Sequence, residues 1–223
     1  MKAEESKKRK MQDEAAQTSM PFAQNTSAGA ELSRIFPSPV LDLLVDDFFT
    51  YIHPLAPLPH EPSYRAAMEA EDAFSNPETV ALTASMIAVL VASFPRRPKM
   101  ILETQGLDKM YASHVDLVDH CIAIGLQARG TNCLDAAGDL TVYQGIISYF
   151  FALSLAYTVR LDHSRFYFAE ALTIVRLLGA QKADDPSFNP VRLWPIQTPV
   201  ARGDAIQKEL GRRLFWVIFI GVR

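Results

Sequence analysis

The side chains with the greatest capacity for chemistry lie in a proline-rich stretch, YIHPLAPLPHEP, at residues 51–62. His53 and the pair His60–Glu61 could ligate a metal or move a proton, because imidazole titrates near neutral pH. Metal sites need several ligands on one face or loop, however, and no cysteine or second histidine pair accompanies these residues. The prolines instead preset an extended path that a helix cannot follow. We therefore interpret the stretch as a rigid connector between two helices, in which His53 and His60 bind backbone carbonyls.

The remaining histidines and the two cysteines form no recognisable catalytic or metal-binding set. His114 and His120 are six residues apart on a predicted helix and so point in different directions, and His163 stands alone. Cys121 belongs to an apolar helical stripe, where a thiol acts as a small hydrophobic group, and Cys133 lies in a predicted loop. Motifs for a nucleophilic serine or a phosphate-binding loop are missing from the sequence. We expect a non-enzymatic protein with no metal or cofactor of its own, in a reducing compartment.

The N-terminal segment is polar, charged and poor in large apolar side chains. Such a segment cannot bury enough surface to offset the entropy of ordering, so we predict that residues 1–34 are disordered. Within it, Lys7, Lys8, Arg9 and Lys10 form an unbroken run of cations. The run favours a nuclear import signal, and a merely solvated charge run is the alternative. Acidic neighbours on both sides argue against a DNA contact, because they repel phosphates.

The elements that must position these residues are predicted to be helices. Hydrophobic residues make up 49% of the chain, glycine is sparse, and the long segments lack the alternating apolar pattern of strands. Apolar spacing, capping residues and proline breaks delimit seven helices. They cover residues 38–52, 63–71, 78–94, 106–127, 142–159, 162–178 and 204–221. The helix at 78–94 is apolar on all sides, which predicts a position in the middle of the core.

Particular residues mark the expected ends of these helices. Thr141 and Gln144 have the spacing of a capping box, in which each side chain satisfies the other's backbone donor. Gly179 is expected to end a helix in the left-handed conformation. The predicted N-caps are Ser38, Asn76, Asp162 and Asp204. The predicted buried stripe of the helix at 162–178 consists of Phe166, Ala169, Leu172, Val175 and Leu178.

The last helix carries the sequence ELGRRLFWVIFIGVR at residues 209–223. We expect Phe215 and Trp216 to anchor the core, while Arg212 or Arg213 lies along an aromatic ring or donates to a loop carbonyl. A ligand or DNA contact by the arginines is the less favoured alternative. Helices normally bury each apolar face against a neighbour, and no further helix follows here to cover Leu214 through Ile218. We therefore expect an incomplete helical bundle with an uncovered apolar patch.

Two segments resemble the regulatory middle homology domain of fungal binuclear zinc-cluster transcription factors. LLVDDFFTYIHPLAPLPHEPSYRAAM is similar to a helix of that domain that ends in a histidine–proline segment, and RRLFWVIFIGVR to its arginine–tryptophan helix. The matching positions are Tyr51, His53, Pro54, His60, Glu61, Pro62, Arg212, Arg213 and Trp216. On this resemblance, residues 35–223 are the N-terminal part of an all-α regulatory domain. It implies a nuclear protein that acts through the transcription machinery or another regulatory partner, a second copy of the chain included.

Two features depart from that family. Val222 stands where an aspartate usually precedes the final arginine, and the six-cysteine zinc cluster has no counterpart among two cysteines. Zinc and DNA binding are therefore expected only through a segment outside this chain. Residues 35–223 also hold 16 Lys and Arg against 20 Asp and Glu, which disfavours contact with a duplex. No run approaches the ~18 apolar residues of a membrane span. The alternative function is a free-standing helical scaffold that binds a protein partner.

Overall fold

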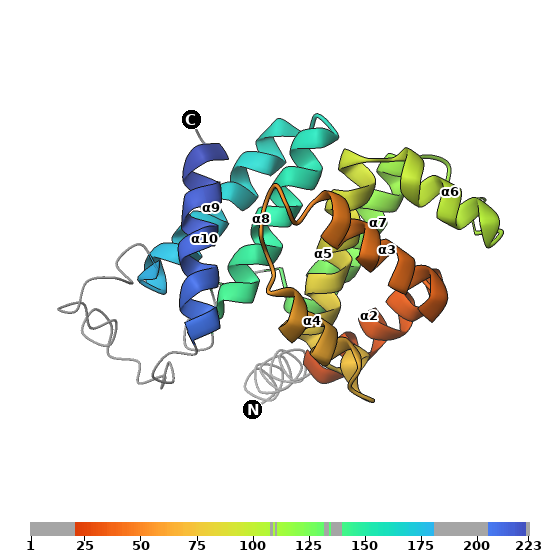
Figure 1. The fold of residues 1–223 in the computed structure, drawn as a ribbon, viewed down its shortest axis with the longest axis horizontal. Helices are drawn as coiled ribbons and strands as arrows, with labels where there is room; N and C mark the ends of the chain where they lie inside the picture. The colour runs from red at the N-terminus through yellow and green to blue at the C-terminus, as the bar shows by residue number, and fades with distance from the viewer. Residues whose placement is uncertain are drawn as a thin grey trace, which may run out of the picture.

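The computed structural model describes residues 21–107, 109, 111–131, 134, 140–180 and 205–221, with the backbone alone for 21–27. Every regular element in these ranges is helical, which confirms the predicted all-α class (Figure 1). The elements are α2 (Pro21–Ile35), α3 (Ser38–Tyr51), α4 (Glu61–Met68), the short 3-10 helix η1 (Ala73–Ser75), α5 (Pro77–Ser93), α6 (Arg96–Thr104), α7 (His114–Arg129), α8 (Val142–Tyr157), α9 (Leu161–Leu177) and α10 (Ala205–Gly221). Seven of these α-helices match the predicted ones, and α2 and α6 were not predicted. The expectations for Lys7–Lys10, Cys133 and Asp204 lie outside the described residues.

The central helix of the bundle is α5. All residues from Thr79 to Ala92 are buried, because α2, α3, α7 and α8 pack around it. Asn76 begins the helix as predicted, since its Oδ1 accepts the backbone N–H of Glu78 at 2.9 Å and of Thr79 at 3.3 Å. The apolar character of the helix on every side thus reflects its position in the core.

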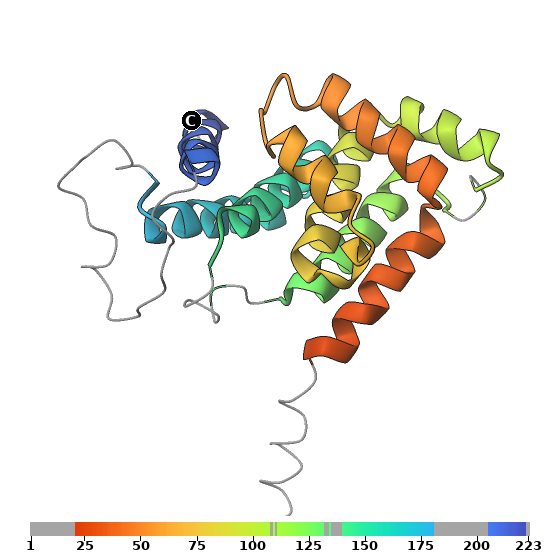
Figure 2. The ribbon, with the colours of Figure 1, turned by 60° about the horizontal axis from the view of Figure 1, so that its bottom comes forward.

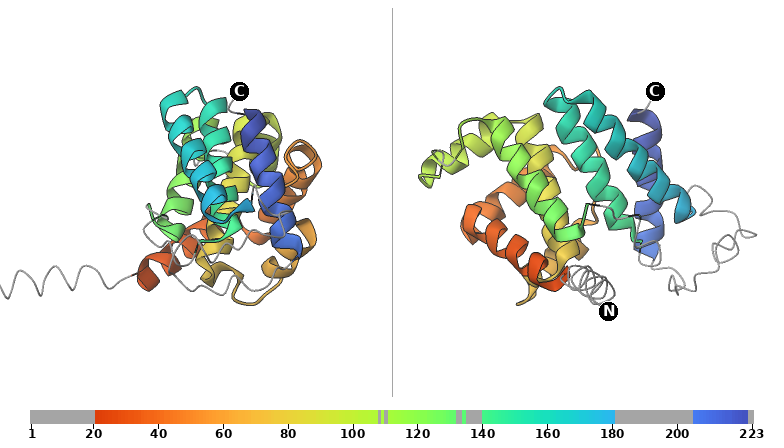
Figure 3. Two further views of the ribbon diagram at one scale, coloured as in Figure 1. Left: turned by 90° about the vertical axis from the view of Figure 1, so that its left-hand side faces the viewer. Right: turned by 180° about the vertical axis from the view of Figure 1, so that it is seen from behind.

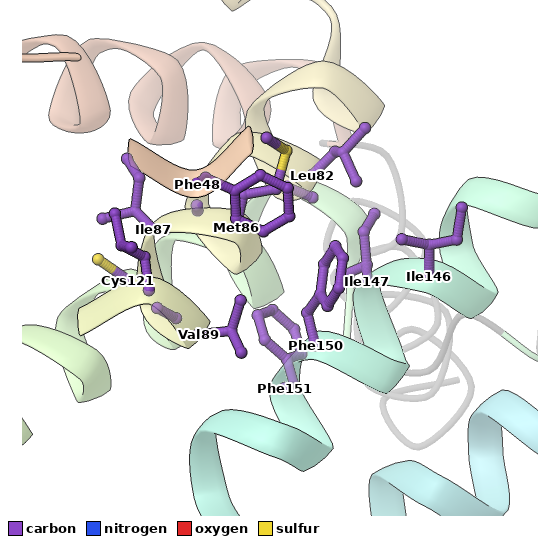
Figure 4. Packing of buried hydrophobic residues seen from close by; sticks show 14 of the residues in the cluster. Phe48, Leu82, Met86, Ile87, Val89, Cys121, Ile146, Ile147, Phe150 and Phe151 are labelled. Atoms are coloured by element: carbon purple, nitrogen blue, oxygen red, sulfur yellow. The ribbon is translucent and has the colours of Figure 1, made fainter. Parts of the chain in front are cut away.

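Aromatic side chains of α8 fill the space between α3 and α5. Figure 4 shows Phe150 and Phe151 pointing toward Met86 and Val89 of α5. Phe150 also meets Phe48 of α3 edge to face, with ring centroids 5.5 Å apart. These rings are almost fully buried, so they tie α8 to the central part of the core.

The capping box predicted at the start of α8 forms only in part. Thr141 is the N-cap, and its Oγ1 accepts the backbone N–H of Gln144 at 3.3 Å. The hydroxyl proton of Thr141 goes to the carboxylate of Glu78, at the start of α5, in a short hydrogen bond. Burial raises the pKa of Glu78, and this hydrogen bond partly opposes the rise. The cap of α8 therefore also joins the first turns of two neighbouring helices.

The N-terminal prediction is wrong for the part of the segment that α2 covers. Ala28, Leu32 and Ile35 follow one another at helical spacing and are at most 1% exposed against the core. Gly29 lies so close to η1 that a Cβ atom would be 2.1 Å from the carbonyl oxygen of Phe74. The average composition of residues 1–34 is polar, but a few well-spaced apolar residues with a small one between them suffice to dock this helix.

The region from 95 to 129 also differs from the prediction. The predicted FPRRP break at residues 94–98 already contains the first turn of α6, which begins at Arg96. The helix predicted to begin at Gly106 begins only at His114. Gly106 has φ +69°, a left-handed conformation that ends the helical path, and Ser113 caps α7 by accepting the N–H of Asp116 at 3.2 Å. Cys121 in α7 is fully buried, and burial raises the pKa of its thiol, so it packs as the predicted small hydrophobic residue.

Of the two predicted end signals of α9, the C-terminal one is confirmed and the N-terminal one is wrong. Gly179 ends the helix in the left-handed conformation as predicted, with φ +69°. The N-cap is Arg160 rather than Asp162, which lies in the first turn. The predicted buried stripe is right for Val175, which is fully buried, and wrong for Phe166, which is 60% exposed, and for Ala169, which is also exposed. The buried residues of α9 are Ser164, Glu170, Ala171, Ile174 and Val175.

In the described part of the chain, no single helix is long and apolar enough to cross a membrane. Only α5 and α6 taken together reach the required length and composition, and their axes are bent by 111° at the break between them.

Candidate functional site

The proline-rich connector runs from the end of α3 to the start of α4 and is tied to itself by His53. The Nε2 atom of His53 lies 3.1 Å from the carbonyl oxygen of Pro59. A carbonyl oxygen can only accept, so Nε2 carries the proton and donates it. The ring of His53 also packs beside Phe49 of α3, with centroids 5.3 Å apart. The predicted role of His53, binding a carbonyl that a proline leaves without a ladder partner, is confirmed.

His60 has a different task from the one predicted. It is the N-cap of α4, where its Nδ1 accepts the backbone N–H of Ser63 at 3.4 Å and lies 2.8 Å from the Ser63 hydroxyl. Glu61 points along the helix to Arg65, with Oε1 to Nε at 2.8 Å. The same guanidinium binds Asp46 of α3 at 2.8 Å. His60 and Glu61 are thus engaged in starting and attaching a helix rather than in exchanging a proton with each other.

Tyr51 anchors the other end of the connector. Its ring lies 5.7 Å from that of Phe94, and the guanidinium of Arg97 sits over it at 5.4 Å. Arg97 also binds both carboxylate oxygens of Asp47, at 2.7 and 3.2 Å. These contacts fix the end of α3 against α6, so the path of the connector is set from its first residue. Pro54 and Pro62 flank it, Pro62 being the second residue of α4.

The connector also meets α10, from the far end of the described chain. Nη1 of Arg213 donates to the carbonyl oxygen of Pro57 at 3.5 Å, while its Nε binds Glu209 at 2.8 Å. Arg212 pairs with Glu209 as well, and the two arginines lower the pKa of that carboxyl. The expected bond from an arginine of this helix to a loop carbonyl is therefore present, and it joins segments 156 residues apart.

The packing of α10 corrects two expectations. Leu214 and Ile218 were expected to lack a cover, but both are fully buried against α8 and α9. The approach is close, because a Cβ atom at Gly145 of α8 would be 2.8 Å from Leu214 Cδ2. Trp216 was expected to anchor the core and is instead 53% exposed. The arginine–tryptophan helix is thus held by its aliphatic residues. Figure 2, which looks nearly along α10, shows this helix beside α8 and α9.

The other side of α10 presents an apolar surface that we call the outer face of α10, formed by Phe215, Trp216, Phe219 and Ile220. Trp216, Phe219 and Ile220 are 53%, 41% and 71% exposed. The three aromatic rings pack on one another, with centroids 5.5 to 6.0 Å apart. Aromatic side chains that support one another at a surface are typical of protein interfaces. This face is what remains of the predicted uncovered patch.

A buried polar cluster was missed by the sequence interpretation. Three polar side chains from neighbouring helices meet in it: Arg129 of α7, Ser148 of α8 and Glu170 of α9. Arg129 donates to the carboxylate of Glu170 at 2.9 Å and to the hydroxyl of Ser148 at 2.8 Å. The Ser148 hydroxyl donates to Glu170 at 2.7 Å. The guanidinium also lies over the rings of Phe151 and Tyr167. Arg129 lies at the end of a helix whose last turn was predicted as loop. The one available signal was Glu170, an acid among the apolar residues of α9.

The described residues contain no group of three or more His, Cys, Asp and Glu side chains that could hold a metal ion. His120 binds Glu31 of α2 at 3.0 Å, and His114 and His163 are exposed on different helices. The predicted candidates therefore come together at the connector and α10 and nowhere else in this part of the chain. No family model, curated protein or solved structure matches the chain.

Proposed function

We propose that this chain is the regulatory and interaction domain of a nuclear transcription factor of the fungal zinc-cluster type. The observation that carries the proposal is the contact between Arg213 and Pro57. Arg213 and Pro57 lie 156 residues apart, in the two segments that resemble the family, and each of these resemblances is weak by itself. Their meeting in space, in which the Arg213 side chain donates to a backbone carbonyl of the connector, is what related domains with a common architecture would require.

The chemistry of the motif residues supports a role that depends on surfaces rather than on catalysis. His53 donates to a backbone carbonyl, His60 caps a helix, and Arg213 holds the connector against α10. These side chains stabilise the fold through their hydrogen bonds. A general acid or base must instead be within reach of a substrate proton. The domain would then act by holding and presenting faces such as the outer face of α10.

In this proposal, contact with DNA is made by a separate segment that carries the zinc cluster, and this chain supplies protein contacts. Residues 35–223 carry more acids than bases, so a duplex repels them unless one face is locally basic. Metal analysis and a DNA titration of the purified chain test this division of labour. One zinc per chain, or binding to one sequence far above competitor DNA, would contradict it.

The direct test joins the chain to an unrelated DNA-binding domain and measures a reporter gene in a fungal host. We expect the fusion to raise or lower the reporter several-fold relative to the DNA-binding domain alone. Trp216→Ser should weaken the effect, because it removes the largest side chain of the outer face of α10 without touching the core. Tyr157→Ser is the matched control, since Tyr157 is 58% exposed at the end of α8. A fusion that is nuclear and folded but leaves the reporter unchanged would refute the proposal.

The second candidate, a free-standing helical scaffold, is favoured by the same outer face of α10, which suits a protein partner of any kind. The scaffold hypothesis predicts a different result. A scaffold purified from its host should carry a bound protein partner whose retention depends on Trp216, and its reporter fusion should behave like the DNA-binding domain alone.

A further inference from the structure

A pocket of ≈ 450 Å³ lies between α6, the end of α5 and the start of α7. The right-hand view of Figure 3 shows α6 at the end of the molecule away from α10. The floor of the pocket is apolar, because Leu102 and Leu117 are only 4% and 3% exposed and Val91 and Pro98 are buried beside them. Small-molecule sites commonly measure about 300–1,000 Å³ and combine such an apolar lining with a few polar groups. The pocket therefore has the size and the floor of a ligand site.

The rim of the pocket carries an excess of positive charge. Arg96 and Lys99 come from α6 and His114 begins α7, and all three are exposed. Glu103 is the acid on the rim, and Lys99 offsets its charge with Nζ 3.6 Å from Oε1. Arg96 makes no ion pair with any carboxylate in the described part of the chain. A guanidinium offers a planar pair of donors that fits a carboxylate, so one binding group at the mouth is available to an anion.

We propose that this pocket binds a small amphipathic carboxylate. Its apolar body would lie on Leu102 and Leu117, and its carboxylate would meet Arg96 at the mouth. Burial of the body supplies most of the affinity, because apolar surface leaves water, and the charge selects an anionic over a neutral head group. This site is separate from the connector and α10, so it stands or falls independently of the proposed role in transcription.

The test uses the full chain and two probes of equal chain length, sodium octanoate and octan-1-ol, titrated by calorimetry or ligand-observed NMR. We expect both to bind in a saturable way and octanoate to bind several-fold more tightly. Arg96→Gln should remove that preference and leave octanol binding unchanged. Arg176→Gln is the matched control, because Arg176 is an exposed arginine of α9, far from the pocket in sequence and element. Ala112→Trp should weaken both probes at least tenfold, since it fills the pocket from an exposed position.

The outcomes separate clearly. Loss of the octanoate preference in Arg96→Gln but not in Arg176→Gln, together with loss of both probes in Ala112→Trp, supports the site. The proposal is overturned if octanoate shows no saturable binding or binds no more tightly than octanol. It is also overturned if Ala112→Trp, shown to be folded by circular dichroism, binds as the wild-type chain does, or if the two arginine variants weaken octanoate equally.

Discussion

Replacing Glu170 by glutamine should destabilise the fold more than any other Glu→Gln change we can identify. The side chains of Arg129 and Glu170 are 1% and 6% exposed, so water cannot screen or solvate either charge. Removing one member of a buried ion pair takes away the attraction that offsets the burial of the other charge, and it costs about 3–5 kcal/mol. The glutamine oxygen can still accept the hydrogen bond from Ser148. We therefore expect the lower end of that range, a loss of about 3 kcal/mol in the free energy of unfolding.

The assay is urea unfolding followed by circular dichroism, supported by thermal melts. In a domain of this size, about 3 kcal/mol should lower Tm by roughly 6–12 °C. Glu103→Gln is the matched control, because Glu103 pairs with Lys99 at 3.6 Å with both side chains well exposed. Such a surface pair contributes about 0–1 kcal/mol, so the control should leave unfolding almost unchanged.

A double replacement tests the cause rather than the size of the effect. Arg129→Met combined with Glu170→Leu removes both charges and leaves Ser148 bonded to the carbonyl oxygen of Gln144 at 3.0 Å. Apolar replacements of a buried pair are often neutral, so the double variant should be more stable than Glu170→Gln. The reasoning is refuted if Glu170→Gln unfolds like Glu103→Gln, or if the double variant is no better than the single one.

Four further changes have expected results. Burial raises the pKa of Glu78 in the folded state, so this carboxyl binds more protons in folded than in unfolded chains. The contribution of Glu78 to stability should therefore fall as pH rises above its ordinary value of about 4.5, and Glu78→Gln should remove that contribution in pH-stepped melts. Gly125→Ala should cost about 1–3 kcal/mol in urea unfolding, because its Cβ would be 2.6 Å from Phe151 Cζ. His53→Phe, which keeps the ring but loses the bond to Pro59, should cost about 1 kcal/mol in the same assay. Alanine at Lys7–Lys10 should move a large fluorescent fusion from nucleus to cytoplasm, and unchanged nuclear accumulation would refute the import signal.

Ser38 was predicted as an N-cap but is the first residue of α3, whose N-cap is Pro37. Three other helix ends, each of which depends on one residue and its immediate backbone, were predictable from the sequence. Asn76 begins α5, Thr141 begins α8 and Gly179 ends α9, in each case through a hydrogen bond or a φ value that involves only near neighbours. The break after α3 is equally local, because Pro54 supplies no N–H and disfavours helical geometry at His53. Asp162 was wrong because Arg160, not Asp162, has the backbone geometry of the cap.

The candidate site was predictable in its residues and only partly in their contacts. His53 was correctly expected to bind a carbonyl, since the prolines around it leave carbonyls without partners. The sequence predicted that an arginine of this helix would bind a loop carbonyl, but it did not predict which loop. Pro57 lies 156 residues before Arg213, and only the tertiary path of α10 brings the two residues together. His60 caps α4 because Ser63 follows it by three residues, the spacing of an N-cap contact. This role depends on near neighbours only, but the sequence interpretation assigned His60 to a carbonyl of the connector instead.

The sequence by itself determined that this protein is helical, that a helix stops at the proline-rich connector, and that α5 lies in the core. Each of these properties follows from composition and spacing within a few turns. The tertiary structure decided which side of each helix is buried. In α9, Phe166 faces outward while Glu170 takes an inward position, where it pairs with Arg129. In α10, Trp216 faces outward while Leu214 takes the inward position, where Gly145 leaves room for it. Those choices depend on partners from distant helices, and a pattern within one helix cannot contain them.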